Sequence, residues 1–450
     1  MRDPARGAGE ARRAALERVP LALEDLILRV DALDAEGRGV ARNAEGKVVF
    51  VEGALPGERV AVKIFSERRK FDQARATAIL DPSAGRRPPR CPHFGACGGC
   101  ATQHADERTQ MAAKQRWLED CLERIGKVKP ETMLPVVYGP EWGYRHRARL
   151  SARHVPSRGG GMVGFRERRS THVADMRECH VLPEHVSALI LPLRQLLGEL
   201  SIRERMPQIE VAVGDNVTVL VFRHLVPLAP ADEILLREFA ERHQIHVWLQ
   251  PRGPDTAQPL HPPASGLYYE LPEFGVRFDF RPAEFTQVNF AMNRVLVSKA
   301  VRLLDPQPGE RIADLFCGLG NFTLPLARQG AAVIGFEGSR ELVERARANA
   351  AANGLVAQFE VADLFKTGIS AFGPFQKVLM DPPREGAIEL VKSFPDEWPR
   401  RIVYVSCDPA TLARDASVLV QTRGFRLAAA GVVNMFPHTA HVESVALFER

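Results

Sequence analysis

A cysteine ends a predicted strand near the C-terminus, where its thiol could act as a nucleophile. The run Ile402 to Val405 is apolar or aromatic and predicts a buried strand, which the pair Asp408-Pro409 ends. Cys407, between them, is therefore presented at a turn, and a following helix N-terminus could lower its pKa. A cysteine in such a place is more often inert packing. The neighbouring motifs have to decide between these two interpretations.

Acidic residues follow three further predicted strands of the same region. A strand, a glycine turn and a helix start are predicted over 314–322, and Thr323 stands where a dinucleotide turn would want a third glycine. Glu337, Asp363 and Asp381 come at or just after the strands predicted over 331–337, 358–361 and 377–381. Clustered carboxylates repel phosphates and suit a neutral adenosine with a cationic sulfonium. S-adenosylmethionine is the predicted cofactor, with a helix N-cap as the alternative role for Asp363.

Three cysteines within ten residues, Cys91, Cys97 and Cys100, lie in a glycine-rich loop suited to wrapping a metal centre. A fourth ligand has to come from elsewhere, and Cys179 is a better candidate than Cys121, which lies in a predicted helix. Four thiolates fit either an iron–sulfur cluster or a structural zinc ion, and spacing alone does not separate the two.

The chain is long enough for several domains, and its pattern changes along the sequence. Residues 1–20 are expected to form a flexible tail, and 21–82 a small oligonucleotide-binding type of β-barrel, with strands over 26–30, 47–51, 59–65 and 75–80 among about five. Residues 83–265 are expected to form a central α+β domain that carries the cysteines. It holds a helix over 105–125 and ends in a proline-rich loop over 251–263. Alternating strands and helices over 266–450 predict a doubly wound, Rossmann-like α/β sheet.

Composition restricts the class of protein further. The 450 residues carry a net charge of +5, and no uninterrupted apolar run is long enough to span a bilayer, which predicts a cytoplasmic enzyme without a membrane partner. Seven cysteines, an odd number in a chain of this size, do not indicate a disulfide framework. Basic residues gather in two segments, as would fit a polyanionic partner: Lys63, Arg68, Arg69, Lys70 and Arg75, then Arg86, Arg87 and Arg90.

Taken together, these motifs resemble the RNA uracil-5-methyltransferase family. The resemblance is carried by Cys407 and by the elements Phe285-Thr286-Gln287-Val288-Asn289, Asp381-Pro382-Pro383-Arg384 and His441-Val442-Glu443-Ser444-Val445. The predicted barrel resembles the TRAM RNA-binding module, and the four cysteines match the family's [4Fe-4S] ligands. The combination is most similar to the branch that acts on 23S ribosomal RNA, and it implies that the tRNA branch lacks both the barrel and the cluster.

The resemblance implies a role for each matching residue. Cys407 would be the nucleophile, Glu443 the general base, and Arg149 an arginine near the active site. The cofactor-side residues would be Gln287, Phe316, Asn321, Glu337, Asp363 and Asp381. Asp408 departs from the family, which often has asparagine there, and a carboxylate so close would raise the pKa of the thiol.

The implied reaction adds the thiolate to C6 of uracil, which makes C5 nucleophilic enough to take a methyl group before the base removes the C5 proton. The expected partner is 23S ribosomal RNA, and a monomer is expected. Alternatives are a uracil methyltransferase acting on tRNA or at another ribosomal site, and a non-catalytic RNA-binding protein. A radical iron–sulfur enzyme is disfavoured, because a fourth cysteine would close the open iron position.

Overall fold

The computed structural model describes residues 26–264 and 266–450, which form two compact units, one ending at Arg87 and the other spanning Pro88–Arg450. The tail predicted over 1–20 lies outside the described residues. The predicted domain limits at residues 20, 82 and 265 stay predictions. Within the two described ranges, no helix combines the length and the apolar character that crossing a membrane requires.

The first unit contains a closed five-stranded barrel, which confirms the predicted fold of this region. Alternate side chains such as Leu28, Val49 and Val60 fill its interior, because successive residues of a strand face opposite sides. Its strands follow one another around the barrel in the order β1-β2-β3-β5-β4. They are β1 (Leu26–Leu33), β2 (Gly39–Arg42), β3 (Val48–Glu52), β4 (Arg59–Glu67) and β5 (Phe71–Asp81).

Some basic residues of this unit are exposed to solvent, whereas others form ion pairs within it. Lys63 and the hairpin tip Arg68–Lys70 are exposed. Arg86 instead pairs with the fully buried Glu58 through two contacts of 2.5 and 2.7 Å. Burial by itself raises the pKa of Glu58, but this pair and two backbone donors lower it overall. The second predicted basic segment, which contains Arg86, is therefore partly structural, since Arg86 is bound to the barrel residue Glu58.

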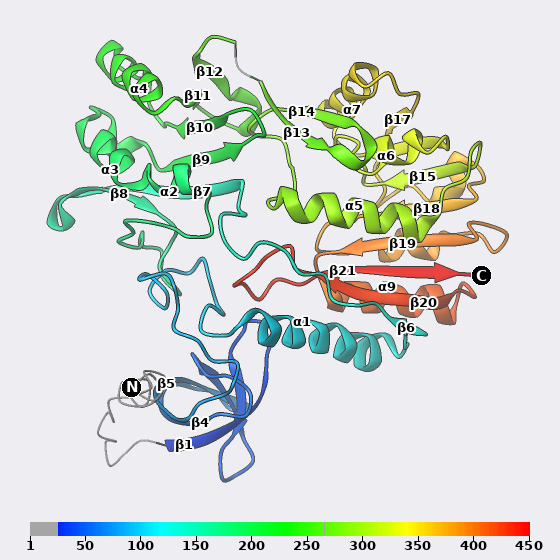
Figure 1. The fold of residues 1–450 in the computed structure, drawn as a ribbon, viewed down its shortest axis with the longest axis horizontal. Helices are drawn as coiled ribbons and strands as arrows, with labels where there is room; N and C mark the ends of the chain where they lie inside the picture. Colours follow the sequence, from blue (N-terminus) through cyan, green and yellow to red (C-terminus); the bar gives the residue numbers. More distant parts are fainter. Residues whose placement is uncertain (1–25, 265) are drawn as a thin grey trace, which may run out of the picture. The chain divides into compact units, whose positions relative to one another are not determined.

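The second unit contains a six-stranded sheet, shown in green in Figure 1, whose strand order is β12-β11-β10-β9-β7-β8. The proline-rich segment predicted as a separating loop contains β12, which pairs with β11, because prolines are tolerated in a strand at the edge of a sheet. The strands are β7 (Arg147–Val155), β8 (Gly160–Gly164), β9 (Gln208–Val213), β10 (Thr218–Arg223), β11 (His246–Gln250) and β12 (Gln258–His261). The helices of this region are α2 (Glu184–Ser187), α3 (Ile190–Glu199) and α4 (Pro230–His243).

A two-stranded hairpin and an eight-stranded sheet follow. The predicted doubly wound sheet is confirmed for its first five strands, which are parallel, but β21 runs antiparallel to both of its neighbours. The hairpin strands are β13 (Leu267–Leu271) and β14 (Val276–Phe280). The sheet has the order β17 (Gln358–Val361), β16 (Ala332–Glu337), β15 (Arg311–Leu315), β18 (Lys377–Met380), β19 (Arg401–Ser406), β21 (Glu443–Glu449), β20 (Arg426–Val433) and β6 (Thr132–Met133).

Helices cover both faces of the eight-stranded sheet, because its central strands are apolar on both sides. In β19, Val403 faces one core, while Ile402 and Tyr404 face the other. The first face carries α5 (Phe290–Leu304), α6 (Thr323–Arg328) and α7 (Arg340–Ala352), and the second carries α1 (Glu107–Cys121), α8 (Ile388–Lys392) and α9 (Pro409–Gln421). The predicted helix over 105–125 is thus α1, capped by Asp106 and continued by a π-helical turn over Leu122–Gly126.

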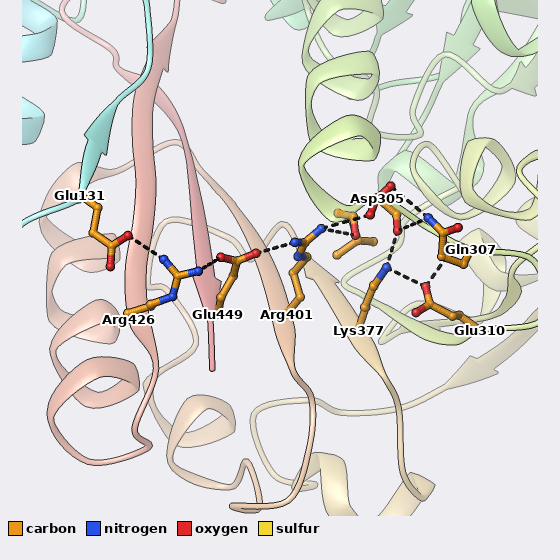
Figure 2. A network of polar contacts seen from close by, with 9 residues as sticks. Glu131, Asp305, Gln307, Glu310, Lys377, Arg401, Arg426 and Glu449 are labelled. Atoms are coloured by element: carbon orange, nitrogen blue, oxygen red, sulfur yellow. Dashed lines mark hydrogen bonds and ion pairs between the residues drawn. The ribbon is translucent and has the colours of Figure 1, made fainter.

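A chain of ion pairs joins the ends of β19, β20 and β21 at the edge where the parallel strands begin (Figure 2). Glu449 lies between Arg401, at 2.5 Å, and Arg426, which also pairs with Glu131 at 2.6 Å. Glu449 is 17 % exposed and Arg401 28 %, so this contact is better shielded from water than a surface pair.

Replacing this carboxylate should weaken the fold. We expect Glu449→Gln to lower the free energy of unfolding by about 1 kcal/mol, because it leaves two guanidinium groups without their shared anion. Urea denaturation at constant pH measures this change. The matched control is Glu389→Gln, which removes an exposed pair with Lys392 and should change stability by less than about 0.5 kcal/mol. Equal losses in the two variants would contradict the prediction.

Candidate active site

A cavity of about 690 Å³ opens at the edge of the eight-stranded sheet where the parallel strands end. This volume is in the range of small-molecule sites. The structure brings most of the predicted site residues together here. Its lining includes the predicted Gln287, Phe316, Glu337, Asp363, Asp381, Cys407 and Glu443, together with Phe285, Phe365, Arg384, Phe436 and His441.

Cys407 follows the last residue of β19 and lies half-buried in this lining. Asp408 caps α9, because its carboxylate accepts hydrogen bonds from the backbone N–H groups of Ala410 (2.8 Å) and Thr411 (3.2 Å). The expectation that the helix N-terminus lowers the pKa of the thiol is wrong: burial raises the pKa of Cys407 to about 11. The carboxylates that raise it further are Glu443 and Asp381 rather than Asp408, while Arg384 acts in the opposite direction.

Two carboxyl groups flank the cysteine, because β18 and β21 lie on either side of β19. Asp381 directly follows β18, and the reversed direction of β21 puts its first residue, Glu443, at the same edge. Burial raises the pKa of Asp381 to about 7. Burial also raises the pKa of Glu443 well above its usual range, and the nearby Asp381 carboxylate raises it further. Such a pair holds a proton near neutral pH, as acid–base chemistry requires.

The cofactor side is built on the turn after β15. Phe316, Gly318 and Gly320 all have a positive φ, of 65°, 57° and 95°, which lets the backbone turn sharply beside the cavity. Glu337, at the end of β16, accepts a hydrogen bond from the N–H of Gly318 at 3.1 Å and another from the N–H of Ser339 at 2.9 Å. The turn and the acidic strand end are therefore fixed relative to each other.

Asp363 is exposed and lies in a turn rather than at the start of a helix, so its alternative role as a helix N-cap is wrong. It forms an ion pair with Lys366 at 2.8 Å, and this contact lowers its pKa. The next aromatic residue, Phe365, also lines the cavity and is 50 % exposed. The local sequence carries no periodic signal that would have indicated Phe365 as part of the site.

Two predicted residues lie outside the lining. The amide group of Asn321 exchanges hydrogen bonds with Asn293 and accepts another from the Tyr269 hydroxyl at 2.9 Å. Its side chain is therefore engaged in hydrogen bonds within the protein, and a contact between Asn321 and the cofactor stays a prediction. Arg149, on β7, forms an ion pair with Glu210 at 3.1 Å, and its proximity to the active site also stays a prediction. Arg147 donates instead to the carbonyl groups of Pro282 and Glu284, just before Phe285.

Two further lining residues, Arg384 on the loop after Asp381 and His441 just before β21, come from the quoted motifs but were given no individual role. Arg384 lies near His441, with 3.3 Å between guanidinium Nη2 and imidazole Nδ1. The loop is anchored by the fully buried Asp415, which accepts from the backbone N–H of Ala387 and the hydroxyl of Tyr404, both at 2.7 Å. Arg384 and His441 belong to the quoted Asp381 and Glu443 motifs, and those motifs were the available signal.

The raised pKa of the thiol has a direct consequence for its reactivity. Since only the thiolate is nucleophilic, alkylation of Cys407 by iodoacetamide should accelerate about tenfold per pH unit up to pH values near the pKa of about 11. Mass spectrometry of the Cys407 peptide gives this rate. Arg384→Gln should slow alkylation at a fixed pH, because it removes the cation that opposes the rise. A rate that levels off near neutral pH would contradict the prediction.

The four predicted metal-ligand cysteines line a second, smaller cavity of about 20 Å³. Burial raises the pKa of Cys100 to about 12, and the thiols of Cys179, Cys97 and Cys91 raise it further. The sulfur atom of Met176 lies 3.8 Å from that of Cys97. The donor set is thus soft, sulfur-rich and largely buried, which fits the metals that thiolates prefer. Among the described residues, no three His, Cys, Asp or Glu side chains have the arrangement of a metal-ion site.

Comparison with known protein families matches two parts of the chain. The model described as tRNA (Uracil-5-)-methyltransferase matches residues 269–450, and the model of the TRAM domain matches residues 26–77. The first region contains the cavity and the second the barrel.

Curated relatives are similar over nearly the whole chain. The 23S rRNA (uracil(1939)-C(5))-methyltransferase RlmD of Thiobacillus denitrificans is 61% identical over 94% of this chain and 99% of its own length. The enzyme of the same name from Dechloromonas aromatica is 57% identical, with the same two shares.

Among solved structures, the Pyrococcus abyssi tRNA (uracil-54, C5)-methyltransferase in complex with S-adenosyl-L-homocysteine has the same fold. It is 24% identical, covers 94% of this chain and 100% of its own, and has a TM-score of 0.72. That the tRNA branch lacks the barrel and the cluster stays a prediction. The fold alone does not separate the two branches, whereas the identity to the curated relatives does. The chain belongs to the RlmD family of 23S rRNA (uracil-C5)-methyltransferases.

Proposed function

We propose that the protein uses S-adenosylmethionine to convert one uridine of 23S ribosomal RNA to 5-methyluridine. The observation that carries this proposal is the placement of Cys407 between Asp381 and Glu443 in a single cavity that Phe316 and Glu337 also line. A nucleophile, a base and a cofactor-sized space are thereby combined. The substrate follows from the curated relatives, whose names specify uracil 1939 of 23S rRNA.

The chain's own residues account for the reaction on uracil. The Cys407 thiolate forms a bond to C6, and the electron pair of the C5–C6 double bond becomes an enolate that is nucleophilic at C5. Bound S-adenosylmethionine supplies an electrophilic methyl group on a sulfonium. Glu443 then removes the C5 proton, the double bond reforms, and the bond between C6 and the sulfur breaks, which regenerates the thiolate. Burial, together with the Asp381 carboxylate, keeps the pKa of this base high, so Glu443 accepts the proton readily.

RNA has to present an unstacked base to this cavity, and two exposed groups of side chains support that role. Phe285 is 69 % exposed, and Arg384, which also lines the cavity, is exposed as well. In the barrel unit, Lys63 and the Arg68–Lys70 hairpin tip offer cationic groups to phosphates. Aromatic faces and cations are the features by which proteins hold single-stranded RNA. The predicted monomeric state stays a prediction.

The test is transfer of a labelled methyl group from S-adenosylmethionine to unmodified 23S rRNA and, in parallel, to unmodified tRNA. We expect label at a single uridine of 23S rRNA, at the position corresponding to 1939, and none in tRNA. Label in tRNA would keep the chemistry and overturn the substrate. Label in neither RNA would support a non-catalytic RNA-binding protein.

We also infer that Cys91, Cys97, Cys100 and Cys179 hold a [4Fe-4S] cluster. The support is the convergence of four cysteine thiols on one cavity, together with the family resemblance of their spacing. A cluster would stabilise the loop by cross-linking segments that are far apart in sequence. Anaerobic purification should give a brown protein with about four iron and four sulfide per chain, and Cys179→Ser should lose the colour. Zinc in place of iron would overturn the assignment.

A further inference from the structure

The loop between β20 and β21, residues 434–442, forms one wall of the catalytic cavity. Phe436 and His441 lie in the lining, with their rings 5.5 Å apart in an edge-on arrangement, and Glu443 follows directly. The strands on either side are held by sheet hydrogen bonds, but the loop itself has no regular structure over most of its length. Its position therefore depends on contacts with other segments.

Four consecutive carbonyl groups of this loop accept hydrogen bonds from four separate segments. The Met435 carbonyl accepts a hydrogen bond from the Asn289 amide (3.2 Å), and the Phe436 carbonyl accepts one from the Lys114 ammonium (2.8 Å). The Pro437 carbonyl accepts one from the Tyr144 hydroxyl (2.8 Å). The His438 carbonyl accepts two, from the backbone N–H groups of Ala101 (2.8 Å) and Thr102 (3.0 Å). Three of these segments precede β7 in the sequence. They therefore reach the loop from more than 290 residues away.

Lys114 of α1 contributes the only ammonium group among these donors. Its side chain is buried and donates to the Asn434 side chain at 3.1 Å as well as to the Phe436 carbonyl. Asn434 in turn donates to Glu107 at 3.2 Å. Burial lowers the pKa of Lys114 to about 7, while Glu107 acts to raise it. A buried lysine is costly to keep, and this one has its polar contacts on the wall of the cavity.

Gln110, one turn before Lys114 on α1, fixes the next part of the loop. Its side-chain oxygen accepts from the backbone N–H of His438 at 2.8 Å, and its nitrogen lies 3.2 Å from the His438 ring. His438 is fully buried, has a φ of 64°, and stacks on Trp142 at 3.9 Å. The left-handed backbone at His438 is unfavourable for a residue with a side chain, so it needs surroundings that hold it in place.

We propose that Lys114, Gln110 and Tyr144 are positioning residues that fix the Phe436–His441 wall against which the target base is held. This proposal rests on the proposed function for the identity of the base. The cofactor side of the cavity is built from β15, β16 and the turn after β17, and it does not depend on these donors. Loss of a donor therefore impairs the steps that need RNA and leaves cofactor binding intact.

The same contacts join the wall to the cysteine-lined cavity. Ala101 and Thr102, which hold the His438 carbonyl, directly follow Cys100, and Gln103 of this segment accepts from the backbone N–H of Cys91 at 3.1 Å. The 434–442 loop therefore contacts the segment that follows Cys100 and also forms the wall of the catalytic cavity against which the target base would lie. Disordering of the cysteine loop would reach the wall by this route.

The experiment compares Lys114→Met, which keeps the length of the side chain and removes its donors, with Lys392→Met, an exposed lysine on α8. We expect Lys114→Met to lower kcat/KM for RNA between about 10- and 100-fold, because misplaced reaction geometry costs rate on this scale. The Kd for S-adenosylhomocysteine, measured by calorimetry, should stay within about twofold of the original protein. Amide hydrogen exchange should rise over 434–442 and stay unchanged over β15 and β16.

Three outcomes would overturn the proposal: unchanged exchange in the loop, a parallel loss of cofactor binding, or equal effects in the control variant. If Lys114→Met does not fold, Tyr144→Phe tests the proposal instead, since it removes only one hydroxyl group. It should raise exchange near Pro437 and lower kcat/KM for RNA, again with cofactor binding retained. Hydrogen exchange and cofactor binding do not require methylation, so a wrong substrate assignment would show separately, as absence of methyl transfer by the original protein.

Discussion

Cys407→Ala should abolish methylation of 23S rRNA and lower kcat by at least about 1,000-fold, because uracil C5 is too weak a nucleophile without a bond from the thiolate to C6. A loss of this size is typical for removal of the nucleophile from an intact site. Initial rates of labelled methyl transfer measure it. The Kd for S-adenosylhomocysteine should stay close to that of the original protein, since the cofactor side of the cavity is built from other strands.

Cys121→Ala is the matched control for this experiment. Cys121 is a buried cysteine that lies on α1 and is not part of the cavity lining. This variant should keep methylation within a few fold. Methyl transfer by Cys407→Ala at more than about one tenth of the original rate would show that the thiol is not the nucleophile.

Glu443→Gln should stop the reaction at the last chemical step and accumulate a covalent complex of protein and RNA. The amide cannot take the C5 proton, so the methylated base stays bonded to Cys407. Denaturing electrophoresis with methyl-labelled RNA should show label that migrates with the protein, while release of free 5-methyluridine RNA falls by at least about 100-fold. The double variant Cys407→Ala with Glu443→Gln is the control and should form no such complex.

The pH dependence of turnover should report the same carboxyl group. Burial and the Asp381 carboxylate raise the pKa of Glu443 well above its usual range, so more of the base is ionised as pH rises. Product release by the original protein should therefore increase with pH above neutrality. In Glu443→Gln this dependence should disappear from the release step. An unchanged release rate in the variant would assign proton removal to another group, with Asp381, the carboxylate in the lining that raises the pKa of Glu443, as the first candidate.

The local units of the fold and most of the site residues could be predicted from the sequence alone. Apolar strands that end in Asp381, Cys407 or Glu337 could be predicted, because alternation and turn residues are local properties. Since parallel strands end at a common edge, the gathering of these side chains followed from the strand assignments. The five-stranded barrel was predictable for the same reason, as short strands separated by glycine turns close on themselves. β20 was missed, because an alanine-rich strand resembles a helix in composition.

The electrostatics of the site and the contacts that hold its residues in place depend instead on the three-dimensional fold. Burial raises the pKa of Cys407, and so do Glu443 and Asp381 at the ends of neighbouring strands, while the helix N-terminus that should have lowered it is occupied by Asp408. Hydrogen bonds join residues that are 28 to 322 positions apart in the sequence. Asn321 bonds to Asn293 and Tyr269, and Lys114 donates to the Phe436 carbonyl. Burial and such distant contacts set the charge and the orientation of a side chain, and no local pattern in the sequence contains them.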